Sequence, residues 1–125
     1  MEKIIIMKSD GTITTIMNQE QVEKYLLNII ENNRVSNLKQ TLNDVTGNNE
    51  KTTGNYIFKK YPVLHASSGN GQTSVTLFFY KTNEAHVIFA MGRHTKPIKG
   101  NTTYEISDYG QEGTDFAKNR KVILK

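Results

Sequence analysis

Two apolar runs, Ser74–Tyr80 and His86–Met91, constrain the fold of this 125-residue chain more than any other feature. The short polar segment Lys81–Glu84 between them favours a direct antiparallel connection. Successive side chains of a strand lie on opposite faces, and both alternating sets of each run contain large apolar residues. The first run divides into Val75, Leu77 and Phe79 against Thr76, Phe78 and Tyr80, and the second into Val87, Phe89 and Met91 against His86, Ile88 and Ala90. We therefore expect two central strands of an antiparallel sheet, with helices on one face and partial cover on the other.

Two amphipathic stretches are expected to supply the helices that cover this sheet. In the first, Asn18 is a suitable N-cap residue for a helix that starts directly after it. Its apolar stripe, at the spacing of one helix face, is Val22, Tyr25, Leu26, Ile29 and Ile30. The stripe of a second, weaker helix is Val35, Leu38, Leu42 and Val45. The helical part of the chain is therefore expected at about 18–45.

The chain before the helices carries the signal of a hairpin. An Asp10-Gly11 pair separates the β-prone runs Lys3–Met7 and Thr12–Ile16. Glycine adopts a positive φ without steric cost, so this pair between two such runs predicts a tight turn. After the helices, Thr46–Asn55 has no apolar residue and is expected to be a surface loop.

The remaining strands are expected in the second half of the chain, at about 56–125. Pro62 limits backbone pairing, so Val63–His65 is predicted as a separate short strand or a strand edge. Gly92–Thr95 is predicted to end the second apolar strand, with Lys96–Asn101 as a basic loop. Thr102–Tyr109 and Arg120–Leu124 are predicted to be later strands.

These elements predict one α+β domain over residues 1–125. Its N-terminal hairpin and two helices would pack on a four- or five-stranded antiparallel sheet. The chain has a formal net charge of +4 and a pI of about 9.3, which favours an anionic partner such as nucleic acid. Many soluble proteins with this charge bind nothing anionic.

Several classes of function are excluded or disfavoured by what the sequence lacks. The absence of cysteine excludes disulfides, thiolate catalysis and cysteine-ligated metal sites. No apolar run approaches the roughly 20 residues of a membrane span, and Lys3–Met7 is too short for a signal-peptide core. Gly69-Asn70-Gly71 is not followed by a helix that could hold a phosphate. His65, His86 and His94 lack the close spacing of metal ligands, so we expect neither a metal nor a cofactor.

The residue types near the ends of the predicted strands match the requirements of metal-independent RNA cleavage. A histidine can take the proton of the 2′-hydroxyl, and a second histidine or a tyrosine can protonate the leaving 5′-oxygen. Cationic side chains stabilise the phosphorane, and aromatic rings stack on bases. The candidate set is His65, Arg93, His94, Thr95, Lys60, Lys96, Lys99, Thr102, Tyr104 and Tyr109. The simpler interpretation is that Arg93 and His94 only place solvated charge at the end of a strand.

Four segments together resemble the small bacterial ribonuclease toxins of the barnase, EndoU, colicin and RelE type. They are Leu64–Ser67, Thr76–Tyr80, His86–His94 and Thr102–Tyr104, in roughly the last half of the chain. The resemblance implies helices followed by an antiparallel sheet with a basic, histidine-containing cleft. It also implies RNA as substrate and a cognate inhibitor or immunity protein as partner.

The resemblance gives roles to five of the candidates and leaves the others to bind substrate. His65 or His94 would be the base or acid, Arg93 would contact the phosphate, and Thr102 or Tyr104 would donate a hydroxyl hydrogen bond. The substrate-binding candidates are Lys60, Thr95, Lys96, Lys99 and Tyr109. Action would take place in the cytoplasm, by a free-standing protein or after secretion and delivery into target cells. The hairpin and the start at Met1 depart from a toxin domain cut from a long secreted protein.

Two other functions fit the same sequence. The first is a non-catalytic binding protein, such as a phage-, plasmid- or immunity-type inhibitor that acts through protein–protein contact. Its basis is the lack of a diagnostic catalytic motif together with strands that are apolar on both faces. The second is small-molecule binding in a pocket lined by Phe78, Tyr80 and Ile88.

Overall fold

The computed structural model describes residues 3–7, 12–28, 38–47, 51–58, 60–68, 75–98, 101–109 and 121–124. For residues 51–56, 58, 68, 93–98, 101–109 and 121–124 it describes the backbone alone. The elements, in chain order, are β1 (Ile4–Ile6), α1 (Gln19–Leu27), α2 (Leu38–Thr46), β2 (Lys51–Phe58), β3 (Tyr61–Ser68), β4 (Val75–Lys81), β5 (His86–Ile98), β6 (Asn101–Tyr109) and β7 (Lys121–Leu124). The predicted α+β class, with helices packed on a sheet, is confirmed.

The described strands form one seven-stranded sheet. Its main path is β2-β3-β4-β5-β6-β7, and every neighbouring pair on this path is antiparallel. The short strand β1 lies parallel to the start of β5, with Ile4 opposite His86 and Ile6 opposite Ile88. The sheet is therefore mixed and has more strands than the four or five expected.

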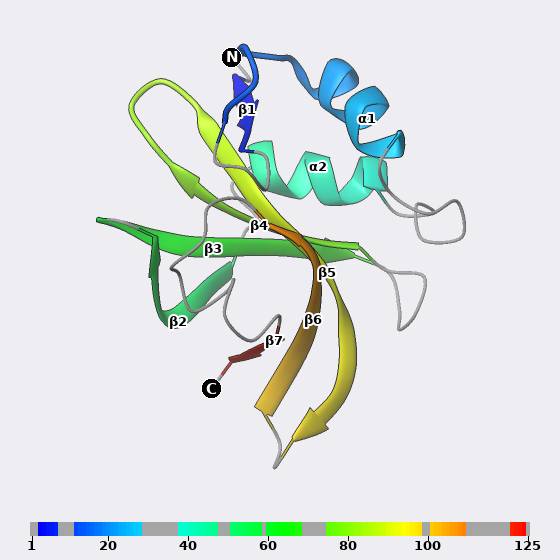
Figure 1. The fold of residues 1–125 in the computed structure, drawn as a ribbon, viewed down its shortest axis with the longest axis vertical. Coiled ribbons are helices and arrows are strands. Elements are labelled where there is room, and N and C mark those ends of the chain that lie inside the picture. The colour runs from blue at the N-terminus through cyan, green and yellow to red at the C-terminus, as the bar shows by residue number, and fades with distance from the viewer. Residues whose placement is uncertain are drawn as a thin grey trace.

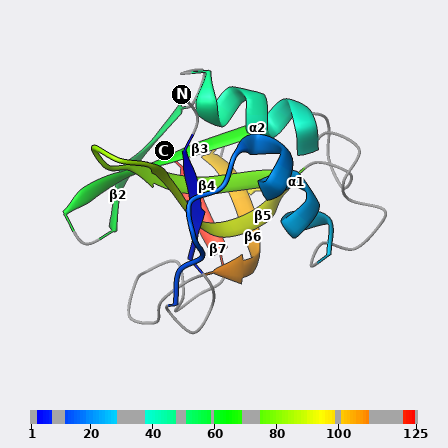
Figure 2. The same ribbon diagram turned by 90° about the horizontal axis from the view of Figure 1, so that it is seen from above.

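The two helices lie on one side of the sheet, and the far halves of β5 and β6 turn away from them (Figure 1). The view from above shows α1 and α2 over β3, β4 and the first half of β5 (Figure 2). On this helix face, the buried residues of one cluster are Ile4, Ile6, Val22, Leu26, Leu38, Leu42, Val45, Ala66, Val75, Leu77, Phe79, Ile88 and Met91. The Thr41 hydroxyl, itself buried, donates a 3.4 Å hydrogen bond to the carbonyl of Val75 and so ties α2 to β4.

The opposite face of the sheet has a second buried cluster. Its members are Met7, Val63, Phe78, Tyr80, Val87, Phe89 and Ala90, with Ile5 and Tyr61 packed against them. We call this side the distal face. The two alternating sets predicted for Ser74–Tyr80 therefore do separate between the two faces, with Thr76, Phe78 and Tyr80 on the distal one. Since Ile88 belongs to the helix face, Phe78, Tyr80 and Ile88 do not line a common pocket, and that hypothesis is wrong.

A β-bulge changes the predicted face assignment within β5. Phe78 is opposite Ala90 while Phe79 is opposite Ile88, so Phe89 is an extra residue in the ladder. Such a residue resets the alternation of the strand after it. Ala90 therefore packs with Val87 and Phe89, and Met91 packs on the helix face, the reverse of what strict alternation predicts.

The N-terminal hairpin is not confirmed. Backbone hydrogen bonds join Ile4 and Met17 in both directions, at 2.9 and 2.8 Å, and a bridge joins Met7 and Ile13. However, residues 12–17 form no strand, and the Asp10-Gly11 turn lies outside the described residues. The β-prone run at the start of the chain instead forms the parallel strand β1, a pairing that local turn chemistry does not reveal.

Strands are longer than expected at three places. Strand β2 begins at Lys51, within the segment predicted to be a loop, and β3 extends across Pro62 from Tyr61 to Ser68. Gly92–Thr95 does not break β5, which continues to Ile98 through half of the predicted basic loop. Backbone pairing between neighbouring strands sets these lengths, so composition alone underestimates them.

Helix α1 begins with a capping box, as Asn18 predicts. The backbone N–H of Gln21 donates to the Asn18 side chain at 2.8 Å, and the backbone N–H of Asn18 donates to the Gln21 side chain at 2.9 Å. Removing the first bond by Asn18→Ala is expected to lower the free energy of unfolding by about 1 kcal/mol. Urea unfolding measures this change. Asn28→Ala at the other end of α1 is the control, because Asn28 closes the helix through its backbone N–H; equal losses in both variants would contradict the capping role.

Candidate functional site

The β5–β6 hairpin places several candidate residues directly opposite one another. His94 is opposite Tyr104, Thr95 is opposite Thr103, and Arg93 is opposite Glu105. Directly opposed residues of antiparallel strands share a face, with Cβ atoms about 4.5–5.5 Å apart. The register thus brings the backbone positions of a histidine and a tyrosine next to each other.

Strand alternation divides the candidates on this hairpin between two faces. His94 and Tyr104 occupy one face, and Thr102 shares it because it is two residues from Tyr104 on β6. Arg93 and Thr95, as sequence neighbours of His94 within one strand, occupy the other face. The prediction that Arg93, His94 and Thr95 act together rested on a strand end that does not exist.

The register also assigns the His94 position to the distal face. Gly92 is opposite Thr76, which belongs to the distal face with Phe78, and His94 follows two residues after Gly92 on β5. Tyr109 is opposite Ala90, another residue of the distal face. The distal face therefore holds the positions of His94, Tyr104, Thr102 and Tyr109.

His65 lies on the distal face as well, but not where the sequence predicted. It is in the middle of β3, opposite Phe78, and is only 6% exposed, whereas a solvent-facing strand end was expected. Its ring lies 6.2 Å from that of Phe78, centroid to centroid. Two strand spacings and four residues separate it from His94, which is about 16 Å along the sheet. His65 and His94 therefore share a face without being neighbours.

The sequence analysis overlooked two other polar residues, Thr76 on the distal face and Glu105 at a position on the other face. Thr76 is fully buried, and its hydroxyl has no hydrogen-bond partner among the described residues. It lies between Ser67 of β3 and Gly92 of β5 in register. A threonine within the apolar run SVTLFFY is the signal that would have identified it.

Glu105 is the second residue missed by the sequence analysis. It lies opposite Arg93 on one side and opposite Lys121 on the other. Opposite charges at directly opposed positions favour cross-strand ion pairing. The register therefore places an acidic residue directly opposite Arg93, a neighbour that the sequence alone does not reveal.

The lysine candidates differ in how the structure places them. Lys60 is exposed in the turn before β3, and its Nζ lies 5.6 Å from the centroid of the Tyr61 ring. Lys96 lies within β5, in the segment where the pairing with β6 becomes irregular. Lys99 lies outside the described residues.

A stack of aromatic rings lies on the distal face near the start of β3. Tyr61 and Tyr80 are parallel to within 11°, with centroids 4.8 Å apart, and Phe89 lies 6.0 Å from Tyr80. Burial raises the pKa of the Tyr80 phenol above its usual value of 10.0, and the neighbouring Tyr61 adds to this effect. Tyr80 is therefore a neutral phenol at physiological pH. The ring of His86, at the start of β5, lies 6.1 Å from the ring of Phe79, a residue of the helix-face cluster.

Comparison with protein-family models, with curated proteins and with solved structures found no significant match. Within the part of the chain that the structure describes, no three acidic or histidine residues gather as metal ligands. None of the described helices is long and apolar enough to cross a bilayer.

Proposed function

We propose that the protein is a metal-independent endoribonuclease whose reactive groups lie on the distal face of the β5–β6 hairpin. The observation that carries this proposal is the register of His94 directly opposite Tyr104. An imidazole next to a phenol offers a proton acceptor and a proton donor at one phosphate. The net charge of +4 is consistent with a polyanionic substrate.

In the proposed reaction, His94 takes the proton of the 2′-hydroxyl. The 2′-oxygen attacks the adjacent phosphorus, the bond from phosphorus to the 5′-oxygen breaks, and Tyr104 protonates that leaving oxygen. The products are a 2′,3′-cyclic phosphate and a free 5′-hydroxyl. Thr102 supplies a hydroxyl hydrogen bond to the phosphate, and Lys96 supplies positive charge near it.

The remaining candidates have supporting roles in this proposal. His65 is almost closed to solvent and is not a neighbour of His94, so we assign it to the scaffold, with no direct contact with the substrate. Tyr109 binds the substrate from the same face. Arg93 and Thr95 occupy positions on the other face of β5. In this proposal they stabilise the β5–β6 hairpin and do not contact the phosphate.

The test is to incubate the purified protein with total RNA and with tRNA in the presence of EDTA. We expect cleavage that EDTA does not inhibit, with products that end in 2′,3′-cyclic phosphate by mass spectrometry. EDTA inactivates any contaminating nuclease that depends on a metal ion, so the remaining cleavage can be attributed to this protein. RNA that stays intact over a wide range of protein concentration would contradict the proposal.

A second candidate function is an inhibitor-type protein that acts by protein–protein contact. It is favoured by Ile13 and Ile16, which are 57% and 51% exposed in the segment next to β1. Exposed apolar residues close together often mark an interface. A single stoichiometric partner that is bound equally well by the wild type and by His94→Ala, and lost with Ile13→Asp, would favour this function.

A further inference from the structure

The start of β3 has the features of a stacking platform for an unpaired base. Tyr61 is partly exposed, whereas its stacking partner Tyr80 is only 6% exposed. Tyr80 in turn contacts Phe89, which is 2% exposed in the distal cluster. The Tyr61 ring is thus held in a fixed orientation by its stacking on Tyr80, which is itself buried in the core. A ring that is already fixed loses little conformational entropy when a ligand stacks on it.

Lys60 gives the platform a cationic neighbour. Its Nζ lies 5.6 Å from the Tyr61 centroid in a cation–π contact, and its side chain is exposed. Such contacts at exposed sites are weaker than the stacking of a nucleobase on an aromatic ring. A base can therefore displace Lys60 from the ring, and the freed ammonium can contact the adjacent phosphate.

We propose that Tyr61 and Lys60 bind one unpaired nucleotide of an RNA strand, the base on the Tyr61 ring and the phosphate at the Lys60 ammonium. This inference rests on the proposed ribonuclease function. It specifies single-stranded RNA as the substrate class of that ribonuclease. An aromatic ring next to a cation is the usual arrangement for binding single strands without reading their sequence. A duplex keeps its bases stacked within the helix and offers none to the ring.

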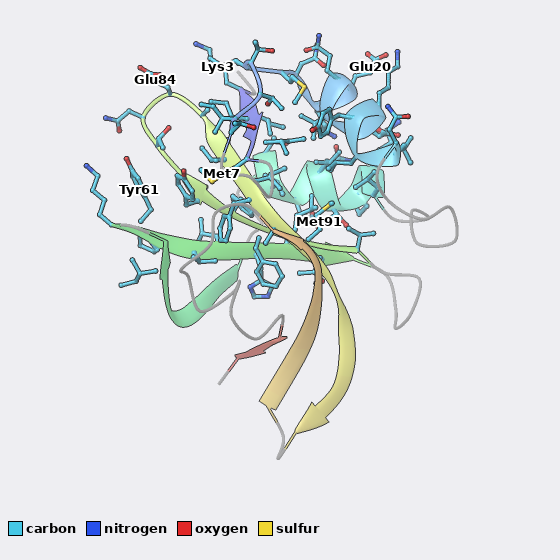
Figure 3. The ribbon with its side chains drawn as sticks, in the orientation of Figure 1. Lys3, Met7, Glu20, Tyr61, Glu84 and Met91 are labelled. Atoms are coloured by element: carbon cyan, nitrogen blue, oxygen red, sulfur yellow. The ribbon has the colours of Figure 1, made fainter. Side chains whose placement is uncertain are left out.

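The platform and the proposed reactive pair lie on the same face but far apart. Tyr61 is four residues before His65 on β3, so about eight residue positions and two strands separate it from His94. This corresponds to about 28 Å along the sheet. Figure 3 shows Tyr61 at the end of β3 that is remote from the β5–β6 hairpin. A long single strand can reach both sites, whereas a dinucleotide bound at His94 cannot reach Tyr61.

The first part of the test is a binding measurement on His94→Ala protein, which keeps the substrate intact. Fluorescence anisotropy with a labelled single-stranded RNA should give an affinity that Tyr61→Leu lowers by about 10-fold. Leucine retains apolar packing against Tyr80 but lacks the flat ring. Tyr61→Phe keeps the ring and should bind within about 2-fold of the parent. Circular dichroism establishes that each variant is folded before its affinity is compared.

Lys60→Ala should lower the affinity and also the salt dependence of binding. Loss of one phosphate contact to a single strand reduces the slope of log affinity against log salt by about 0.7. Lys24→Ala is the matched control, because Lys24 is exposed on α1, away from the distal face. An equal effect of both lysine substitutions, or equal binding of a duplex of the same length, would overturn the platform.

The second part compares cleavage of a long single strand with cleavage of a dinucleotide. Tyr61→Leu should raise KM about 10-fold for the long substrate and leave the dinucleotide unaffected. If the wild type cleaves RNA and Tyr61→Leu has no effect on either substrate, the platform is wrong and the ribonuclease proposal stands. If the wild type does not cleave, but Tyr61→Leu still weakens single-strand binding, the platform stands and the ribonuclease proposal fails.

Discussion

The His94→Ala variant is expected to cleave RNA at least about 100-fold more slowly than the wild type. Removing the imidazole eliminates general-base catalysis, which contributes on the order of 10²–10⁴-fold to such reactions. The loss should appear in kcat, because His94 is proposed to act on the 2′-hydroxyl in the transition state. Single-turnover cleavage of a labelled oligonucleotide in EDTA measures it directly.

His86→Gln is the control for this experiment. His86 lies at the opposite end of the same strand, β5, where its ring packs beside Phe79. Its substitution should leave the cleavage rate within about 3-fold of the wild type, since no step of the proposed reaction uses it. Equal loss in both variants would indicate that β5 tolerates no histidine substitution, and full activity of His94→Ala would remove His94 from the reaction.

The second large effect is expected for Leu26→Ala. Leu26 of α1 is fully buried and packs in the helix-face cluster with Ile4 and Leu42. Truncation of a buried leucine to alanine removes its apolar contacts and leaves a cavity, so the free energy of unfolding should fall by about 2–5 kcal/mol. Urea unfolding monitored by far-ultraviolet circular dichroism measures the change.

Leu27→Ala supplies a closely matched comparison. Leu27 is the next residue of the same helix and is 41% exposed. The two variants share the same change in helix propensity and in side-chain chemistry, so the difference between them reports burial. Leu27→Ala should cost less than about 1 kcal/mol. Similar losses in the two variants would mean that α1 does not pack on the sheet as described.

The central part of the fold can be predicted from the chain because its signals are local and repeated. The alternation in SVTLFFY predicts that Phe78 and Phe79 lie on opposite faces, and the two buried clusters confirm it. The weaker stripe predicted for the second helix is confirmed in α2, where Leu38, Leu42 and Val45 are buried. In both cases every residue needed for the prediction lies within one element.

The features that escaped prediction depend on pairing between distant segments. Strand β1 is parallel to β5, more than 80 positions away, and nothing in Ile4–Ile6 specifies that partner. The bulge at Phe89 arises from the β4–β5 ladder, and it reverses the faces of Ala90 and Met91. The continuation of β5 beyond Gly92 likewise depends on its pairing with β6.

In the candidate site, too, the residue types could be predicted from the sequence, whereas their neighbours depend on strand pairing. His94 and Tyr104 were both chosen for their chemistry, yet only the register of β5 and β6 shows that they are opposite each other. His65 was expected at the solvent-facing end of a short strand, whereas β3 continues past it to Ser68 and His65 is buried. The position of Glu105 opposite Arg93 could not be identified without that register.

If both proposals hold, the platform at Tyr61 and the pair at His94 would bind one strand of RNA at two points of the same face. This arrangement would use the shared distal position of Tyr61 on β3 and of Tyr104 and Tyr109 on β6. It also explains why charge alone was a weak guide, since aromatic rings supply the contacts that distinguish a single strand from a duplex.

The most direct test of the proposed reaction is a pair of oligonucleotides that differ by one oxygen. The first is all-ribose, and the second has a single 2′-deoxy nucleotide on the 5′ side of the bond that the wild type cleaves. In EDTA, the protein should cut the all-ribose strand at that bond and leave the same bond of the deoxy strand intact, because the attacking oxygen is missing. Cleavage of both strands at that bond would contradict attack by the 2′-oxygen, and cleavage of neither would contradict ribonuclease activity itself.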